Sequence, residues 1–257
     1  MIDSHCHLDL AAFDPDREDV LARAAAAGVE GILVPAIRPT TWDAVRALAG
    51  GPVRIALGIH PQIVPELDAS ERALTAEALA HAAREAGAVA IGECGLDGAT
   101  GEHELQDQLL RMHVRAARLA RLPLVVHVLR AHDQAPRVLR EERAHEVGGV
   151  MHSYSGGADL VPVYRDLGFA FSFAGPVTYE NARRPLEAVR AVPAELLLVE
   201  TDAPDQAPAN HRGGRSEPAF VVEIVRAIAA ATGRDDIAAV TTANARRVFG
   251  WSASGSL

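Results

Sequence analysis

The sequence predicts a single-domain α/β protein with the (β/α)8 architecture of a TIM barrel. Short apolar runs alternate with longer amphipathic stretches along the whole chain of 257 residues. There are about eight of these runs, the number of strands in a closed barrel, and the chain length also suits that fold. The runs are almost continuously apolar, as in parallel strands that are buried on both faces. A doubly wound open sheet would show the same alternation, and the number of runs favours the barrel.

The apolar runs predict the strands, and the stretches between them predict helices. In chain order, the runs cover residues 1–8, 31–37, 53–60, 88–96, 123–129, 149–154, 169–174 and 196–201. The clearest helical stretch, residues 102–121, places Leu105, Leu109, Met112, Ala116 and Leu119 on one face. Pro123 should end that helix just before the next strand.

Two more helical stretches, residues 218–231 and 235–248, follow the last predicted strand. No linker rich in proline, glycine or serine divides the chain. We therefore expect one domain over residues 1–251 and a flexible C-terminal tail over residues 252–257.

The composition excludes several classes of mechanism. All 25 basic residues are arginine, so a lysine Schiff base, a P-loop lysine and a carbamylated lysine between two metals are excluded. The net charge of −9 disfavours broad electrostatic capture of nucleic acid, but it permits a local site where metal ions supply positive charge. No apolar run approaches the roughly 18 residues of a membrane span. The N-terminus lacks a signal-peptide pattern and the 2 cysteines form no disulfide framework, so we expect a cytoplasmic protein without membrane association.

Polar side chains interrupt or end most of the predicted strands. They are His5, His7, His60, Glu93, His127, His152 and Asp202. In a parallel barrel the carboxyl ends of all strands open on one face, where barrel enzymes build their active sites. His5 and His7 are two residues apart, so both imidazoles should face the barrel mouth while Cys6 faces outward. We expect Cys6 and Cys94 to be small buried residues rather than ligands.

The candidate donors are imidazoles and carboxylates, which suit divalent zinc, manganese, nickel or magnesium. They do not form a thiolate site. The donors His5, His7, Glu93, His127, His152 and Asp202 are too numerous for one tetrahedral ion, and they fit two ions about 3.5–4 Å apart. With lysine absent, Glu93 is the natural bridging ligand. We therefore expect two divalent ions, Mg²⁺, Mn²⁺ or Zn²⁺, as cofactors.

The remaining histidines and arginines are less informative. His81, His103, His113 and His145 fall on helical stretches, where a solvated or packing role is expected, and His132 stays undecided. The loop of residues 207–217 follows the last strand, so its arginines could hold a phosphate or could equally be solvated. The pairs Arg183-Arg184 and Arg246-Arg247 lie in helical stretches and are expected on solvated faces.

With these residues in place, the chain resembles the TatD-type metal-dependent deoxyribonucleases of the amidohydrolase-like barrel superfamily. The matching stretches are residues 3–8 (DSHCHL), 58–61 (GIHP), 91–97 (IGECGLD), 122–127 (LPLVVH), 151–156 (MHSYSG), 200–204 (ETDAP) and 244–250 (NARRVFG). They extend over nearly the full length of the chain, and together they are specific.

The resemblance implies that His5, His7, Glu93, His127, His152 and Asp202 are the metal ligands. It also implies that Glu93 bridges two ions and that Asp202 binds one ion and serves as general base. His60 matches a family histidine at the barrel mouth that would orient substrate. The sequence departs from the family pattern where Leu129 replaces an arginine, with Arg130 following.

The function expected from the sequence is metal-dependent hydrolysis of phosphodiester bonds. The substrate would be DNA, single-stranded or at strand ends, with the family implying cleavage from the 3′ end. His60, Arg130, Arg212 and Arg215 are the candidate substrate-binding residues, and no obligate protein partner is expected. One alternative is a hydrolase of the same barrel that acts on a small amide, lactone or phosphoester. A more remote alternative is a non-catalytic metal-binding protein.

Overall fold

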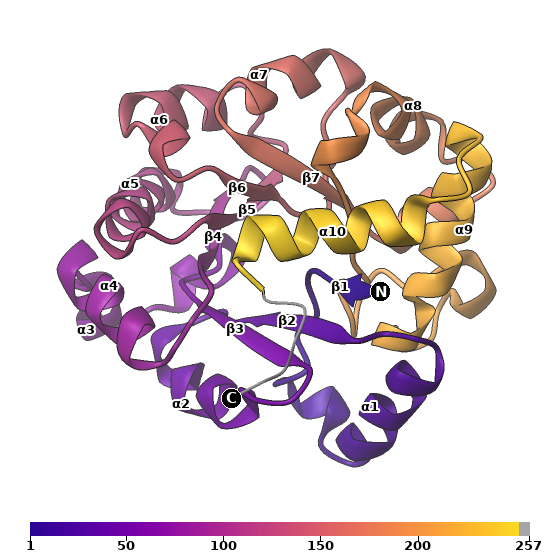
Figure 1. Cartoon of the computed structure of the whole chain (residues 1–257). Coiled ribbons are helices and arrows are strands. Elements are labelled where there is room, and N and C mark those ends of the chain that lie inside the picture. Colours follow the sequence, from indigo (N-terminus) through magenta and orange to yellow (C-terminus); the bar gives the residue numbers. More distant parts are fainter. Residues whose placement is uncertain (252–257) are drawn as a thin grey trace.

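Residues 1–251 are described by the computed structural model of the chain, and they form an 8-stranded parallel sheet in which the strands follow one another in sequence order. The strands are β1 (Ile2–Asp3), β2 (Gly31–Pro35), β3 (Val53–Leu57), β4 (Ala90–Asp97), β5 (Leu124–Leu129), β6 (Gly149–Met151), β7 (Phe169–Phe173) and β8 (Leu197–Val199). Figure 1 shows these strands enclosed by a ring of helices. The predicted tail, residues 252–257, lies outside the described residues.

The sheet closes through the segments that follow β1 and β8. The Ser4 amide donates to the Val199 carbonyl over 3.1 Å, and the His7 amide donates to the Ala203 carbonyl over 2.7 Å. The structure therefore confirms the predicted TIM barrel. The seam runs directly beside the predicted ligands His5, His7 and Asp202.

Helices lie between the strands and after the last one. They are α1 (Arg17–Ala26), α2 (Trp42–Leu48), α3 (Ala69–Arg72), α4 (Ala76–Glu85), α5 (His103–Ala120), α6 (Ala135–Glu141), α7 (Val161–Arg165), α8 (Arg183–Ala191), α9 (Val221–Thr232) and α10 (Ile237–Phe249). Across the described part of the chain, none of them is long and apolar enough to cross a membrane.

The helix ends follow local chemistry. The helix predicted over residues 102–121 is α5, and it stops where Arg121 takes the left-handed conformation at φ +57° ahead of Pro123. The stretch predicted as a helix from residue 218 begins as a 3-10 turn, Pro218–Phe220, before α9 starts. Gly233 and Gly250 end α9 and α10 at φ +67° and +61°, conformations that glycine adopts without strain.

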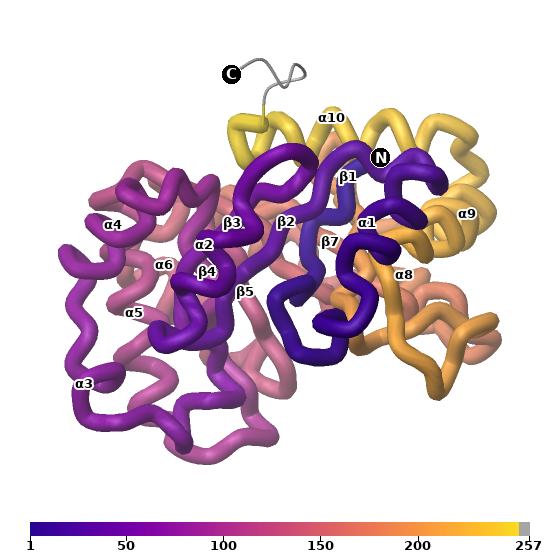
Figure 2. Tube along the Cα trace, turned by 90° about the horizontal axis from the view of Figure 1, so that it is seen from below, coloured from indigo at the N-terminus to yellow at the C-terminus, as the bar shows by residue number. Residues whose placement is uncertain are grey.

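The barrel interior is filled at the end where the strands begin. One buried cluster joins strand residues such as Ile2 and Leu33 with Ala245 and Phe249 of α10 and with Trp251. In Figure 1 and Figure 2, α10 lies across this end of the barrel. Because α10 covers the amino ends of the strands, the open end of the barrel is the one at which the strands finish.

Candidate metal centre

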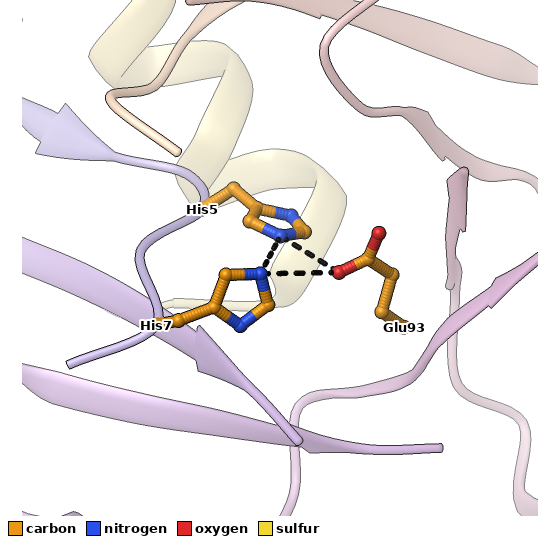
Figure 3. A group of neighbouring side chains, drawn as sticks. All are labelled: His5, His7 and Glu93. Atoms are coloured by element: carbon orange, nitrogen blue, oxygen red, sulfur yellow. Dashed lines mark hydrogen bonds and ion pairs between the residues drawn. The ribbon is translucent and has the colours of Figure 1, made fainter. Parts of the chain in front are cut away.

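Two imidazoles after β1 and one carboxylate of β4 converge at the open end (Figure 3). The Nε2 atoms of His5 and His7 lie 3.2 Å apart, and they lie 3.0 and 3.4 Å from Oε2 of Glu93. Oδ1 of Asp202 lies 3.6 and 3.7 Å from the same two nitrogens. These side chains come from both sides of the barrel seam and from β4, so the closed barrel is what brings them together.

A second group of imidazoles faces the other oxygen of Glu93. Oε1 lies 2.8 Å from Nε2 of His60, 2.8 Å from Nε2 of His152 and 3.2 Å from Nδ1 of His127. The facing nitrogens of His127 and His152 are themselves 3.2 Å apart. Glu93 thus stands between two sets of nitrogen donors, with one oxygen turned toward each set.

The fully buried Glu93 carboxylate fits a metal centre. Among the described residues, neither of its oxygens has a hydrogen-bond partner of acceptable geometry. Burial alone would raise its pKa, but His152, His60 and His5 outweigh that effect and hold the pKa well below the ordinary value. A buried carboxylate without hydrogen bonds is costly unless cations lie beside it. Nitrogen and carboxylate donors that share one small space are a set that divalent metal ions bind.

Local chain geometry explains how the donors approach one another. In the pattern expected for extended backbone, His5 and His7 point into the barrel mouth, and Cys6 between them packs into the outer core. Cys6 and Cys94 are both buried free thiols. Their burial is as predicted from the sequence, and neither belongs to the donor groups around Glu93.

Glycines at two positions let neighbouring backbone segments approach each other closely beside the donors. A Cβ atom on Gly95, whose φ is +147°, would lie 1.8 Å from the carbonyl oxygen of His127. A Cβ atom on Gly58 would lie 2.5 Å from the carbonyl oxygen of Glu93. Any larger residue at either position would push β3, β4 or β5 apart beside the donors.

Buried carboxylates orient the imidazoles from behind. Oε1 of Glu200 lies 3.3 Å from Nδ1 of His152 and accepts the Ser153 amide over 2.6 Å. Oδ2 of Asp97 lies 3.4 Å from Nε2 of His127, and this contact holds the pKa of Asp97 below its ordinary value. Such partners fix the ring orientation and raise the basicity of metal-binding histidines.

Asp202 is held by a side chain four residues further along. Both Asp202 and Gln206 take left-handed backbone conformations, at φ +51° and +47°. The Gln206 amide nitrogen donates to Oδ2 of Asp202 and to the Ser153 hydroxyl. This leaves Oδ1 of Asp202 turned toward His5 and His7.

A cavity of about 660 Å³ opens above the centre, and His7, Glu93, His127, His152 and Asp202 are among its lining residues. Much of its wall is apolar, formed by Leu10, Ile37, Ile63, Val128, Leu129, Phe173, Pro176 and Val177. Pockets of this size take a small ligand or the end of a longer one.

The predicted substrate-binding residues lie in different surroundings. His60 lines the cavity and contacts Glu93 at hydrogen-bond distance, so it lies beside the candidate metal donors. Arg130, Arg212 and Arg215 are not among the residues that line the cavity. The guanidinium of Arg215 instead pairs with Asp16 and Glu217, and that of Arg212 lies 4.8 Å from the centroid of the Tyr179 ring.

Sequence reasoning did not single out Glu200, Asp97, Gln206 or Arg184. Glu200 interrupts an apolar strand just as Glu93 does, so the criterion that selected Glu93 would also have found it. Gln206 acts through a loop conformation that leaves no signal in the sequence. Arg184 was assigned to a solvated helix face; it is exposed, and it also lines the cavity.

Two histidines outside the centre, His113 and His132, have packing partners. His113 is fully buried, with Nε2 accepting the Ile59 amide over 2.9 Å and Nδ1 facing the Leu109 carbonyl over 2.6 Å. This is the packing role expected for a histidine on a helix. His132, undecided from the sequence, lies 2.9 Å from the Tyr164 hydroxyl and 3.1 Å from the Ser155 hydroxyl, away from the donor groups.

A TIM barrel whose strand ends gather buried histidines and carboxylates around one shared glutamate defines a metal-dependent hydrolase. The chain matches the model of the family described as TatD related DNase over residues 2–250. It therefore belongs to the TatD family.

Relatives of known name agree with this placement. The chain is 36% identical to the Escherichia coli protein YcfH, over 99% of this chain and 97% of the relative, and 35% identical to Bacillus subtilis YabD, over 97% and 98%. Both are described as uncharacterized metal-dependent hydrolases. The crystal structure of the Escherichia coli TatD homologue YjjV superposes with a TM-score of 0.89 at 31% identity, covering 98% of each chain.

Proposed function

We propose that the protein uses two divalent metal ions to hydrolyse phosphodiester bonds of DNA at strand ends. The observation that carries this proposal is the division of donors around Glu93. Oε2 faces His5 and His7, whereas Oε1 faces His60, His127 and His152. A carboxylate placed between two sets of nitrogen donors supports a bridging role, and paired ions are a recurrent device for phosphodiester cleavage.

Each residue has a distinct part in this proposal. His5, His7 and Asp202 would hold one ion, His127 and His152 the other, and Glu93 both. The ions supply Lewis acidity that activates water and offsets charge on the phosphoryl oxygens. The Asp202 carboxylate would also accept the proton of the attacking water, and the hydrogen bond from Gln206 to Oδ2 fixes the orientation of that carboxylate.

The size and the apolar wall of the cavity support action at an end of a strand. A space of about 660 Å³ with apolar walls suits the terminal part of a strand better than a long continuous track. The net charge of −9 also disfavours broad electrostatic capture of a duplex. Cleavage from the 3′ end belongs to the same proposal, on the strength of the family resemblance. So does a cytoplasmic location, which the two free thiols of Cys6 and Cys94 support.

The direct test is cleavage of single-stranded DNA labelled at either end, with Mg²⁺, Mn²⁺, Zn²⁺ or a chelator. We expect metal-dependent ladders whose labelling pattern shows loss from the 3′ end. Asp202→Asn should lower kcat by about 100-fold or more, whereas Asp166→Asn, at an exposed carboxylate beyond α7, should leave it unchanged. Metal content of each protein is measured in parallel. Wild-type protein that holds metal and leaves DNA intact would overturn the proposal.

The apolar cavity wall favours one second candidate, hydrolysis of a small lactone, amide or phosphoester at the same centre. These substrates are assayed beside DNA with the same proteins and metals. Turnover of a small ester without cleavage of DNA would establish this candidate, and cleavage of DNA alone would exclude it.

A further inference from the structure

The cavity above the centre has an uneven distribution of charge. The buried carboxylates Glu93 and Asp202 line it among the imidazoles, and apolar side chains form much of the rest of its wall. The exposed charged residues on its rim are Arg184, at the start of α8, and Asp205, after β8. Since the chain contains no lysine, Arg184 is the one non-histidine cation among the described residues that line this cavity.

The guanidinium of Arg184 is available to a ligand. Within residues 1–251 it makes no ion pair and no hydrogen bond to another side chain or to the backbone, unlike the guanidinium of Arg215, which is paired with Asp16 and Glu217. The side chain is exposed, whereas the metal donors are buried, so it stands at the solvent side of the cavity.

The residues around Arg184 show on which side of the cavity its positive charge lies. Burial and, to a smaller extent, the charge of Arg184 lower the pKa of His132 to about 4. His132 bonds to Ser155, which lines the cavity beside Tyr154 and Gly156. Helix α8 also packs against Ala158–Leu160, a turn in the segment after β6, so the positive charge lies on the side of the wall that this segment builds.

A ligand that complements this cavity has three parts in order. A hydrolysable bond lies at the donor groups, an apolar or ring-shaped portion lies against the apolar wall, and a second anionic group lies at the rim. The negative charge of Asp205 disfavours an anion on the side of β8, which leaves the side of α8 for it. Arginine is well suited to such a group because its planar fork donates paired hydrogen bonds to phosphate or carboxylate.

We propose that Arg184 is a specificity-determining residue that binds a second anionic group of the substrate, beyond the bond that is hydrolysed. This inference rests on the proposed function, since it places the scissile diester at the donor groups. In a DNA strand the second anion is the phosphate next to the scissile one. In a small substrate it is a terminal phosphate or a carboxylate.

The test compares substrates that differ only in the second anion. One is a thymidine dinucleotide with an additional terminal phosphate, at the 5′ or the 3′ end, and another is the same dinucleotide without it. A dinucleotide with a carboxylate in place of the terminal phosphate separates phosphate from carboxylate recognition, and bis(p-nitrophenyl) phosphate serves as a diester with no second anion.

Arg184→Gln is compared with Arg183→Gln, a change at the exposed neighbour that does not line the cavity. We expect Arg184→Gln to raise KM for one of the phosphorylated dinucleotides by about tenfold, the loss of one charged hydrogen-bonding contact. The kcat for that substrate, and turnover of bis(p-nitrophenyl) phosphate, should stay unchanged. Arg184→Lys should restore part of the loss, because it keeps the charge but not the fork.

Binding of the same dinucleotides to the metal-loaded proteins is measured by calorimetry at two salt concentrations. If the wild type binds the phosphorylated dinucleotide without cleaving it, the proposed function fails, and the Arg184 assignment stands only if Arg184→Gln weakens that binding. Any of three results would overturn the assignment. Arg184→Gln could weaken action on substrates with and without the second anion equally, or Arg183→Gln could have the same effect as Arg184→Gln. The wild type could also show no measurable preference for the substrates that carry the second anion.

Discussion

Lowering the pH should destabilise the folded protein, in part because of His113, a fully buried histidine of α5. Burial lowers its pKa from 6.5 to about 4, because the charged ring loses hydration in the core. Protonation would also place a hydrogen on Nε2, which accepts a hydrogen bond from the Ile59 amide. That hydrogen bond would be lost, because both atoms would then be donors.

The size and direction of the effect follow from these two pKa values. Between pH 6.5 and about 4 the unfolded chain binds the proton and the folded protein does not, so stability falls as the pH falls through that window. Above pH 6.5 the contribution is complete. The difference between the two pKa values corresponds to about 3 kcal/mol of unfolding free energy.

The assay is urea unfolding at several pH values between about 7 and 4, for wild type and His113→Gln. Other acidic and histidine groups titrate in both proteins, so the informative quantity is the difference between their free energies of unfolding. Because glutamine does not titrate, that difference should shift by about 3 kcal/mol in favour of the variant as the pH falls. His81→Gln, at an exposed position of α4, should follow the wild type throughout. Parallel profiles for wild type and His113→Gln would refute the reasoning.

Two further predictions concern residues that support the site and the fold. Glu200→Gln removes the carboxylate behind His152 and should weaken metal binding by about 10–100-fold, measured by competition with a chelator; the exposed Glu195→Gln serves as control, and unchanged affinity would contradict the supporting role. Arg215→Ala should lower the free energy of unfolding by about 1 kcal/mol and leave KM for DNA unchanged, because its guanidinium is paired with Asp16. A raised KM without a loss of stability would instead assign Arg215 to substrate binding.

The barrel was predictable because its signals are local. Each buried parallel strand leaves an apolar run, each helix leaves an amphipathic stretch, and the chain repeats this pair along its length. The candidate donors were predictable for a related reason. In a parallel barrel every strand runs toward the same open face, so a polar residue that interrupts an apolar run, such as His127 or Glu93, is expected to reach that face.

The arginines illustrate what the sequence could not supply. The sequence predicts substrate binding for Arg215 and a solvated helix face for Arg184, yet Arg184 lines the cavity and Arg215 is held by ion pairs outside it. Which way a long side chain on a helix or loop extends depends on partners that are distant in the sequence. Asp16, the partner of Arg215, comes from the segment before α1, near the opposite end of the chain.

The sequence by itself determined the alternation of strands and helices, the barrel and the residue types that reach its open end. Periodicity and strand direction fix those features without any contact between distant segments. Only the tertiary structure decided that Glu93 turns one oxygen to His5 and His7 and the other to His60, His127 and His152. That division depends on how the strands close around the carboxylate, and closure joins segments from the two ends of the chain.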